Sequence, residues 1–276
     1  MPTHDVPVLR VATLNTWGTR GDWAARREVL AAGLAALDAD VIALQETIRT
    51  DGYDQAADVL GDGYALVHQR EREADGQGVT TASRLPIGEV VELDLHVTQR
   101  STGFACTSLV TEILAPDPIG RVWFVNDLPD WQLDHEYERE RQAVATAGAL
   151  ERLLTDRPGH VVVAGDFDAD PEAASIRFWT GRQSLDGRSV CYRDAWAAAN
   201  PDRPPRDGHT FVPDNPHSAD WDWPYRRIDY ILVRCGEHGG PSLAVTACRR
   251  TFDQPGTSVS DHYGLVADLS LPPVRR

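Results

Sequence analysis

Short apolar segments separated by Gly, Pro and charged turns are the feature of this sequence that most constrains its fold. They recur from residue 8 to residue 271, and their length and boundaries are typical of β-strands. Apolar residues at helical spacing predict helices over residues 22–40, where Asp22 is the expected N-cap, and over 135–154. Groups of strands separated by a few helices indicate an α+β or layered α/β architecture.

The composition narrows the classes of protein that the chain can belong to. The 276 residues include no low-complexity linker, so we expect a single domain over residues 1–276. The formal net charge is −15, and all 27 basic residues are arginine, which disfavours a broad surface for a nucleic-acid backbone. No apolar run could span a membrane, and the amino terminus does not resemble a secretory leader.

The four cysteines give a prediction about the compartment. None of them forms a CxxC pair, and no histidine lies at the spacing of a zinc finger, which disfavours a structural zinc site or a disulfide framework. We therefore expect buried free thiols and a cytoplasmic protein, and we expect it to act as a monomer.

Several apolar segments end beside a side chain that can bind a metal ion or a phosphate. These side chains are Asn15, Glu46, Asp166, Asp168, Asp229, Asp261 and His262. Any one of them alone would be interpreted as a cap, a turn former or a surface charge. Together they supply oxygen ligands and one histidine, and oxygen ligands favour Mg²⁺, Mn²⁺ or Ca²⁺ over zinc.

The motifs around these residues resemble those of one family. They are "TLN" (13–15), "LQE" (44–46), "SRLPI" (83–87), "GDFDADP" (165–171), "RIDYI" (227–231) and "SDHYGL" (260–265). In this order, across nearly the whole chain, they are similar to the endonuclease/exonuclease/phosphatase superfamily of deoxyribonuclease-like, metal-dependent phosphoesterases. The resemblance implies a four-layer α/β/β/α sandwich, in which two mixed β-sheets pack face to face with helices outside. It also implies an active site at one end of the sheets.

The resemblance also implies roles for the motif residues. Glu46 would be the central metal ligand, completed by Asn15 and Asp261. Asp166 would orient or deprotonate the attacking water. His262 would hydrogen-bond the phosphate or act as an acid or base, and Asp229 would orient its ring.

Two positions depart from the family pattern. Asp168 stands where an asparagine commonly donates its amide to phosphate, and an ionised carboxylate cannot donate. Either the substrate is contacted differently, or Asp168 helps to hold a second metal ion beside the one that we expect. Asn126 in "VND" matches the family, but Asp127 appears at the place of a phosphate-contacting histidine. Three interpretations of Asp127 follow. It is natural and binds a second cation, it is an engineered change that inactivates the protein, or it marks a chain that has lost some activity.

Other residues are candidates for binding the substrate. Arg84 is one of them, although an ion pair with nearby acids at the strand end is the interpretation that we favour. The long segment 200–224 precedes "RRIDY" and would border the mouth of the site, where Trp221, Trp223 and Tyr225 could stack on a base or sugar. Packing of these rings onto the body of the protein is the alternative. Asp170 is expected to cap a helix that begins at Pro171.

The sequence thus predicts a phosphoesterase that needs a divalent cation and hydrolyses a phosphodiester or a phosphomonoester. We expect a phosphorylated small metabolite, a nucleotide or a lipid head group as its substrate, rather than long DNA. The alternatives are a nuclease, and a weakened or inactive member of the family that binds a phosphorylated ligand without turnover.

Overall fold

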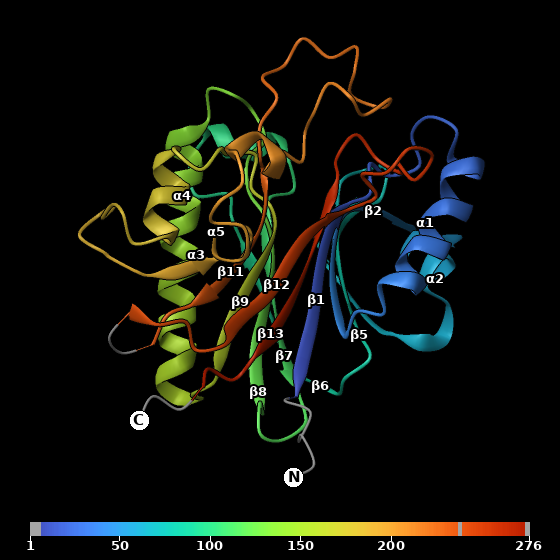
Figure 1. Ribbon diagram of the computed structural model, residues 1–276. Helices are drawn as coiled ribbons and strands as arrows, with labels where there is room; N and C mark the ends of the chain where they lie inside the picture. The colour runs from blue at the N-terminus through green and yellow to red at the C-terminus, as the bar shows by residue number, and fades with distance from the viewer. Residues whose placement is uncertain (1–6, 237–238, 274–276) are drawn as a thin grey trace.

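Two β-sheets packed face to face form the centre of the protein in the computed structural model, which describes residues 7–236 and 239–273 (Figure 1). Helices cover the outer face of each sheet, so the predicted sandwich with helices outside is confirmed. The amino-terminal residues 1–6, on which the expectation of no secretory leader partly rests, lie outside the described residues.

The first sheet has seven strands: β1 (Val8–Asn15), β2 (Val41–Thr50), β3 (Tyr53–Asp54), β4 (Ala65–His68), β5 (Gln77–Ser83), β12 (Ala244–Thr251) and β13 (Gly264–Ser270). Their order is β12–β13–β1–β2–β5–β4, and β3 pairs with β2. The neighbours β1 and β2 are parallel, whereas β13 runs antiparallel to β1.

The second sheet has six strands: β6 (Ile87–Asp94), β7 (Thr107–Leu114), β8 (Arg121–Leu128), β9 (His160–Asp166), β10 (Tyr192–Asp194) and β11 (Asp229–Arg234). Their order is β10–β11–β9–β8–β7–β6. The pair β8 and β9 is parallel, and β9 is antiparallel to β11. Both sheets are therefore mixed, as predicted. The short strands β3 and β10 were not predicted.

The helices are α1 (Trp23–Leu37), α2 (Gln55–Leu60), α3 (Glu136–Asp156), α4 (Ala174–Trp179) and α5 (Ala195–Ala199), with 3₁₀ turns η1 (Gly61–Gly63), η2 (Arg100–Gly103) and η3 (Pro205–Gly208). The first four lie in two outer layers, whereas Ala195 and Trp196 of α5 join the buried cluster between the sheets. Leu30 and Leu34 of α1 pack on Leu44 of the seven-stranded sheet, whereas α3 and α4 pack on the six-stranded sheet (Figure 1). Asp22 caps α1, because its carboxylate accepts from the backbone N–H of Ala25.

The core between the sheets follows from strand alternation. Successive side chains of a strand point to opposite faces of its sheet, so every second residue meets the other sheet. Val11 and Val41 from the first sheet share a buried cluster with Phe124, Val162 and Ile231 from the second. The central parts of these strands are mainly apolar and buried on both faces, which gives the site a rigid base.

Two local predictions were wrong. Asp170 does not cap a helix at Pro171: α4 begins at Ala174, and the Asp170 carboxylate instead accepts from the backbone N–H of Glu172 in the turn before it. Three of the cysteines are buried free thiols, but Cys191 is exposed. Within the described ranges, no helix is long and apolar enough to cross a membrane.

The topology brings the polar ends of several strands to one edge of the sandwich. β1 ends at Asn15, and the parallel β2 carries Glu46 one residue beyond the partner of Asn15. Because β13 is antiparallel to β1, the turn that contains Asp261 and His262 reaches the same edge. In the second sheet Asp166 lies directly opposite Asp229.

Candidate active site

A cavity of about 650 Å³ opens at this edge. Its lining includes most of the residues that the motifs predict, namely Glu46, Asp166, Asp168, Asp261 and His262, together with Trp221 and Trp223. Asn15 and Asp229 lie directly behind this lining, where they bond to Asp166 and His262 respectively. The strand ends of both sheets therefore contribute to one site.

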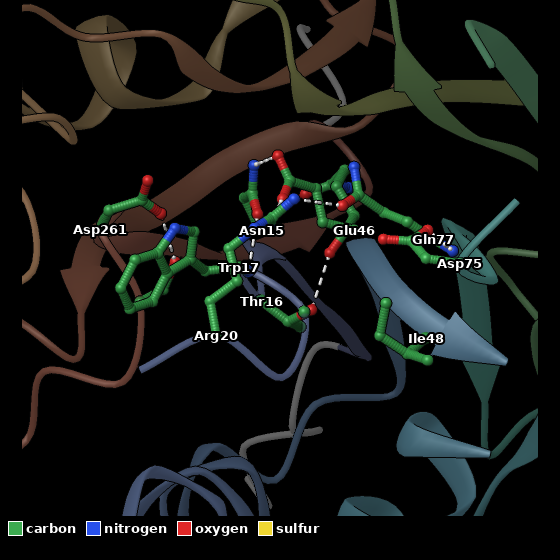
Figure 2. A network of polar contacts seen from close by, with 12 residues as sticks. Asn15, Thr16, Trp17, Arg20, Glu46, Ile48, Asp75, Gln77 and Asp261 are labelled. Atoms are coloured by element: carbon green, nitrogen blue, oxygen red, sulfur yellow. Dashed lines mark hydrogen bonds and ion pairs between the residues drawn. The ribbon is translucent and has the colours of Figure 1, made fainter. Parts of the chain in front are cut away.

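Asn15 joins the two sheets at the base of the cavity. Its amide Nδ2 donates to Oε1 of Glu46 over 3.1 Å and to Oδ2 of Asp166 over 2.9 Å. Its Oδ1 accepts from the backbone N–H of Trp17 over 2.9 Å (Figure 2). The amide nitrogen thus holds two carboxylates close together, although like charges repel, while the bond from Trp17 fixes the orientation of the amide.

Glu46 lies at an irregularity of β2. Its φ is +55°, and the register between β2 and β5 shifts between Leu44 and Thr47. A left-handed backbone is uncommon for residues other than glycine and is concentrated at functional sites. Oε2 of Glu46 pairs with Arg20 over 2.6 Å, and the other terminal nitrogen of Arg20 donates to Gln77 over 2.7 Å (Figure 2). The bulge thus turns the Glu46 carboxylate towards the cavity, and the Arg20 guanidinium holds it there.

His262 and Asp229 form a buried pair. Nδ1 of His262 lies 3.0 Å from Oδ2 of Asp229, and Nε2 lies 3.8 Å from Oδ2 of Asp166. Burial alone would lower the pKa of the His262 imidazole, but the three surrounding carboxylates outweigh it and raise the pKa well above its usual range. With Nδ1 donating to Asp229, the ring presents Nε2 to the cavity.

The remaining acids of the site are strained or desolvated. Burial, followed by the charges of Glu46 and Asp166, raises the pKa of Asp261 to about 6, although His262 acts in the opposite direction. Asp168 has a left-handed backbone with φ +49°, and its N–H donates to Oδ1 of Asp166 over 3.2 Å. Burial and the neighbouring Asp166 raise the pKa of Asp168 well above its usual range.

The donor set suits a divalent cation. Glu46, Asp261 and Asn15 offer oxygen atoms at one end of the cavity, and hard cations prefer oxygen ligands. A different group among the described residues, Asp166, Asp229 and His262, also has ligand atoms within 4.8 Å of one another, but an imidazole with a raised pKa is protonated and donates hydrogen bonds instead of binding a metal ion. A cation bound by the first group would offset the carboxylate charge that raises the pKa of Asp261.

Asn126 and Asp127, both predicted for the site, lie elsewhere. Asn126 is fully buried between the sheets, where its amide accepts from Gln45 over 2.7 Å and donates to the carbonyls of Leu44 and Thr80. Asp127 points to the opposite face of β8 and accepts from Ser108, which also bonds Thr146 of α3. Strand alternation therefore places Leu128, and not Asp127, on the cavity.

Arg84 is also remote from the cavity. Its guanidinium pairs with Asp38 and lies over the ring of Tyr64, 4.8 Å from the ring centroid. This is the ion pair at the strand end that we favoured, so Arg84 is not among the substrate-binding candidates of the site.

Aromatic rings line the other side of the cavity. Trp221 lies edge-on to Trp223, with ring centroids 5.7 Å apart, and Trp223 stacks on Trp131 at 5.8 Å. Phe211 packs edge-on against both Trp221 and His262. Tyr225 stacks on Phe211 from outside and does not line the cavity. Segment 200–224 thus borders the site, as expected.

Sequence reasoning missed several residues of the lining, among them Arg20, Trp131, Phe211 and Arg226. Arg20 follows the "TLN" motif in a polar turn, and Arg226 directly precedes "RIDYI". Their closeness to motif residues was the available signal. Trp131 and Phe211 had no such signal, because loop geometry alone brings them to the cavity.

Comparisons with known proteins agree with this architecture. The model of the Endonuclease/Exonuclease/phosphatase family matches residues 12–262. The fold is similar to an endonuclease/exonuclease/phosphatase from Bacteroides vulgatus, with a TM-score of 0.75 and 18% identity over 96% of this chain and 100% of the other. A search of curated proteins finds no match.

Two TDP2 structures are also similar. Truncated TDP2 from Caenorhabditis elegans has a TM-score of 0.73 and 18% identity over 95% of this chain and 98% of its own. TDP2 from D. rerio, solved as a complex with a single-strand DNA product, has a TM-score of 0.72 and 18% identity over 95% and 99%. At these identities the likeness concerns the fold, while the family match spans most of the chain. The protein belongs to the Endonuclease/Exonuclease/phosphatase family.

Proposed function

We propose that the protein is a phosphoesterase that needs a divalent cation and hydrolyses a phosphodiester or a phosphomonoester bond. The observation that carries this proposal is the joining of Asn15, Glu46 and Asp166 from three strands at the base of one cavity. The His262–Asp229 pair and Asp261 lie beside them. Membership of the family supports the reaction class, because its members include metal-dependent phosphoesterases and nucleases.

The acids at the base of the cavity would hold the cation. Glu46 and Asp261 would supply carboxylate oxygens, and Asn15 would contribute through its amide oxygen or through water. When bound, Mg²⁺ or Mn²⁺ polarises the phosphoryl oxygen and stabilises the leaving oxygen. We expect one ion, and Asp168 would help to hold a second ion if one binds.

Asp166 and His262 would act on the water and the phosphate. Asp166 is held by Asn15 and by the backbone N–H of Asp168, so its carboxylate is fixed where it can orient the water and accept its proton. His262 would donate from Nε2 to a phosphate oxygen, while Asp229 keeps its ring in place and stabilises its positive charge.

The charge of the cavity supports a small substrate with little negative charge. Six acidic side chains line the cavity, and two arginines and the His262 imidazolium offset part of their charge; the acids are Glu46, Glu73, Asp75, Asp166, Asp168 and Asp261. A divalent cation neutralises only part of this excess, so a monoanionic diester is repelled less than a polyphosphate or a long DNA strand. The aromatic wall suits a base, a sugar or the apolar part of a lipid head group.

A nuclease is the second candidate. The D. rerio relative binds a single-strand DNA product, and exposed tryptophans such as Trp221 can stack on bases of a single strand. A third possibility is that Asp168 marks a weakened site that binds a phosphorylated ligand without turnover, since a carboxylate there repels phosphate unless it is protonated or metal-bound.

The test is metal-dependent release of nitrophenol from bis(p-nitrophenyl) phosphate and from p-nitrophenyl phosphate, with Mg²⁺, Mn²⁺ or chelator. We expect turnover that depends on the cation and is faster on the diester. Nucleotides, phospholipid head groups and single-stranded oligonucleotides, assayed in parallel, separate the small-molecule and nuclease candidates. Absence of turnover on the whole panel would contradict the proposed function and leave the binding-only interpretation.

A further inference from the structure

Arg226 is the one cation lining the cavity that has no carboxylate partner among the described residues. Arg20, the other arginine of the lining, is bonded to Glu46 and Gln77 and so has its terminal nitrogens engaged. A phosphoester needs hydrogen-bond donors around its non-bridging oxygens, and ionised acids cannot donate. Given the proposed function, we propose that Arg226 binds the phosphate group of the substrate.

The backbone fixes Arg226 at the end of the segment that carries Phe211, Trp221 and Trp223. It forms an antiparallel bridge with Phe211, in which each residue donates its N–H to the carbonyl of the other over 3.0 and 3.1 Å. Nη1 of Arg226 donates to the carbonyl of Asp168 over 2.9 Å. The guanidinium therefore lies between the strand-end acids and the aromatic wall, where the reacting phosphate would meet the rest of the substrate.

The remaining donors of Arg226 are unused. Nε is buried and has no hydrogen-bond partner within residues 7–236 and 239–273, and Nη2 makes no hydrogen bond there. A buried donor without a partner destabilises a protein and calls for a physical explanation. A phosphate oxygen supplied by the substrate provides one, because guanidinium and phosphate form charge-assisted hydrogen bonds.

Arg182 offers a matched control. It donates to the carbonyl of Pro171 and pairs with Glu172, so it anchors the same loop after β9 that Arg226 anchors through Asp168. Arg182 does not line the cavity. A purely structural role of Arg226 in holding this loop predicts similar effects of the two substitutions, whereas phosphate binding predicts different ones.

The experiment compares Arg226→Ala, Arg226→Lys and Arg182→Ala with the wild type. The dissociation constant for inorganic phosphate is measured by calorimetry in the presence of Mg²⁺. Loss of a charge-assisted pair should weaken phosphate binding about tenfold to a hundredfold in Arg226→Ala. Arg226→Lys should be intermediate, because it keeps the charge but not the planar fork. Arg182→Ala should stay within about twofold.

Turnover of bis(p-nitrophenyl) phosphate gives a second readout. Added guanidinium ion should restore part of the activity of Arg226→Ala and none in Arg182→Ala. The proposal would be overturned if Arg226→Ala bound phosphate as tightly as the wild type does. It would also be overturned if Arg226→Ala and Arg182→Ala lost phosphate affinity to the same extent. If Arg226→Ala does not fold, Arg226→Lys decides by the same criterion. If the wild type binds phosphate but has no turnover, the proposed function fails and the binding measurement still tests Arg226.

Discussion

The two sides of the cavity are built in different ways. On one side, Asn15, Glu46 and Asp166 project from strands of two packed sheets and are joined by hydrogen bonds. On the other, Phe211, Trp221 and Trp223 come from a long segment between β10 and β11 and touch mainly one another. The strand side is held by the core of the protein, and the loop side by ring contacts and by the backbone bridge between Phe211 and Arg226.

This difference suggests that the strand side carries out the reaction and that the loop side recognises the substrate. Atoms that hold a metal ion and orient a water must be placed within fractions of an ångström, which packed strands allow. Rings that stack on a substrate tolerate movement, and loops can vary without disturbing the fold. Substitutions on the strand side should therefore reduce turnover, whereas those on the loop side should change affinity and substrate preference.

The largest effect is expected for Glu46→Gln. An amide keeps the shape of the side chain but removes the charge that would hold the cation, so kcat/KM should fall by about 10³-fold. The assay is turnover of bis(p-nitrophenyl) phosphate over a titration of Mn²⁺. Glu28→Gln, on the exposed face of α1, is the control and should match the wild type. A loss of less than about tenfold in Glu46→Gln would place the cation elsewhere.

A smaller loss is expected for Asp229→Asn. Asp229 does not line the cavity and acts through the ring of His262, 3.0 Å away. Substitution of a residue that orients an active-site side chain through a hydrogen bond typically reduces activity by about 10–100-fold. We expect kcat to fall by that factor with KM little changed, as measured under saturating Mn²⁺. A change in KM alone would show that Asp229 serves binding and not the orientation of His262.

On the loop side, Trp223→Ala should act on KM. Stacking on an aromatic side chain is worth about 1–3 kcal/mol per base, so KM for thymidine 5′-(p-nitrophenyl phosphate) should rise about tenfold with kcat preserved. Methyl p-nitrophenyl phosphate offers no base to stack and should be affected less. Tyr137→Ala removes an exposed ring on α3 away from the cavity and serves as the control. Equal effects on both substrates would mean that the wall only packs the loop.

The sequence predicted the strand side better than the loop side, for a physical reason. Apolar alternation marks strands, and the polar residues at their ends must meet when the strands share a sheet edge, so Asn15, Glu46 and Asp166 could be placed together in advance. Whether Trp131 or Phe211 reaches the cavity depends on the path of loops, which no local pattern encodes. Asp170 shows the same limit, because its turn and a helix cap have the same residue preferences.

The two faces of β8 provide the smallest expected effect on activity. Leu128 lines the cavity, and Asp127, one residue earlier, points to α3 and is bonded to Ser108. Burial raises the pKa of Asp127 to about 7, against the opposing effect of the Ser108 hydrogen bond. Its unfolded value is about 3.8, so the folded protein binds one proton more than the unfolded chain between these two pH values.

The free energy of unfolding should therefore fall as the pH rises from about 4 to about 7, and stay at the lower level above that. Asp127→Asn removes this titration. The variant should unfold at a higher temperature than the wild type at pH 8, and the difference should shrink towards pH 4. Its kcat/KM should equal that of the wild type, because the amide would occupy the same pocket between β7 and α3, away from the cavity. A large change in activity with no change in the pH dependence of unfolding would instead place Asp127 in the reaction, as its position in the motif first suggested.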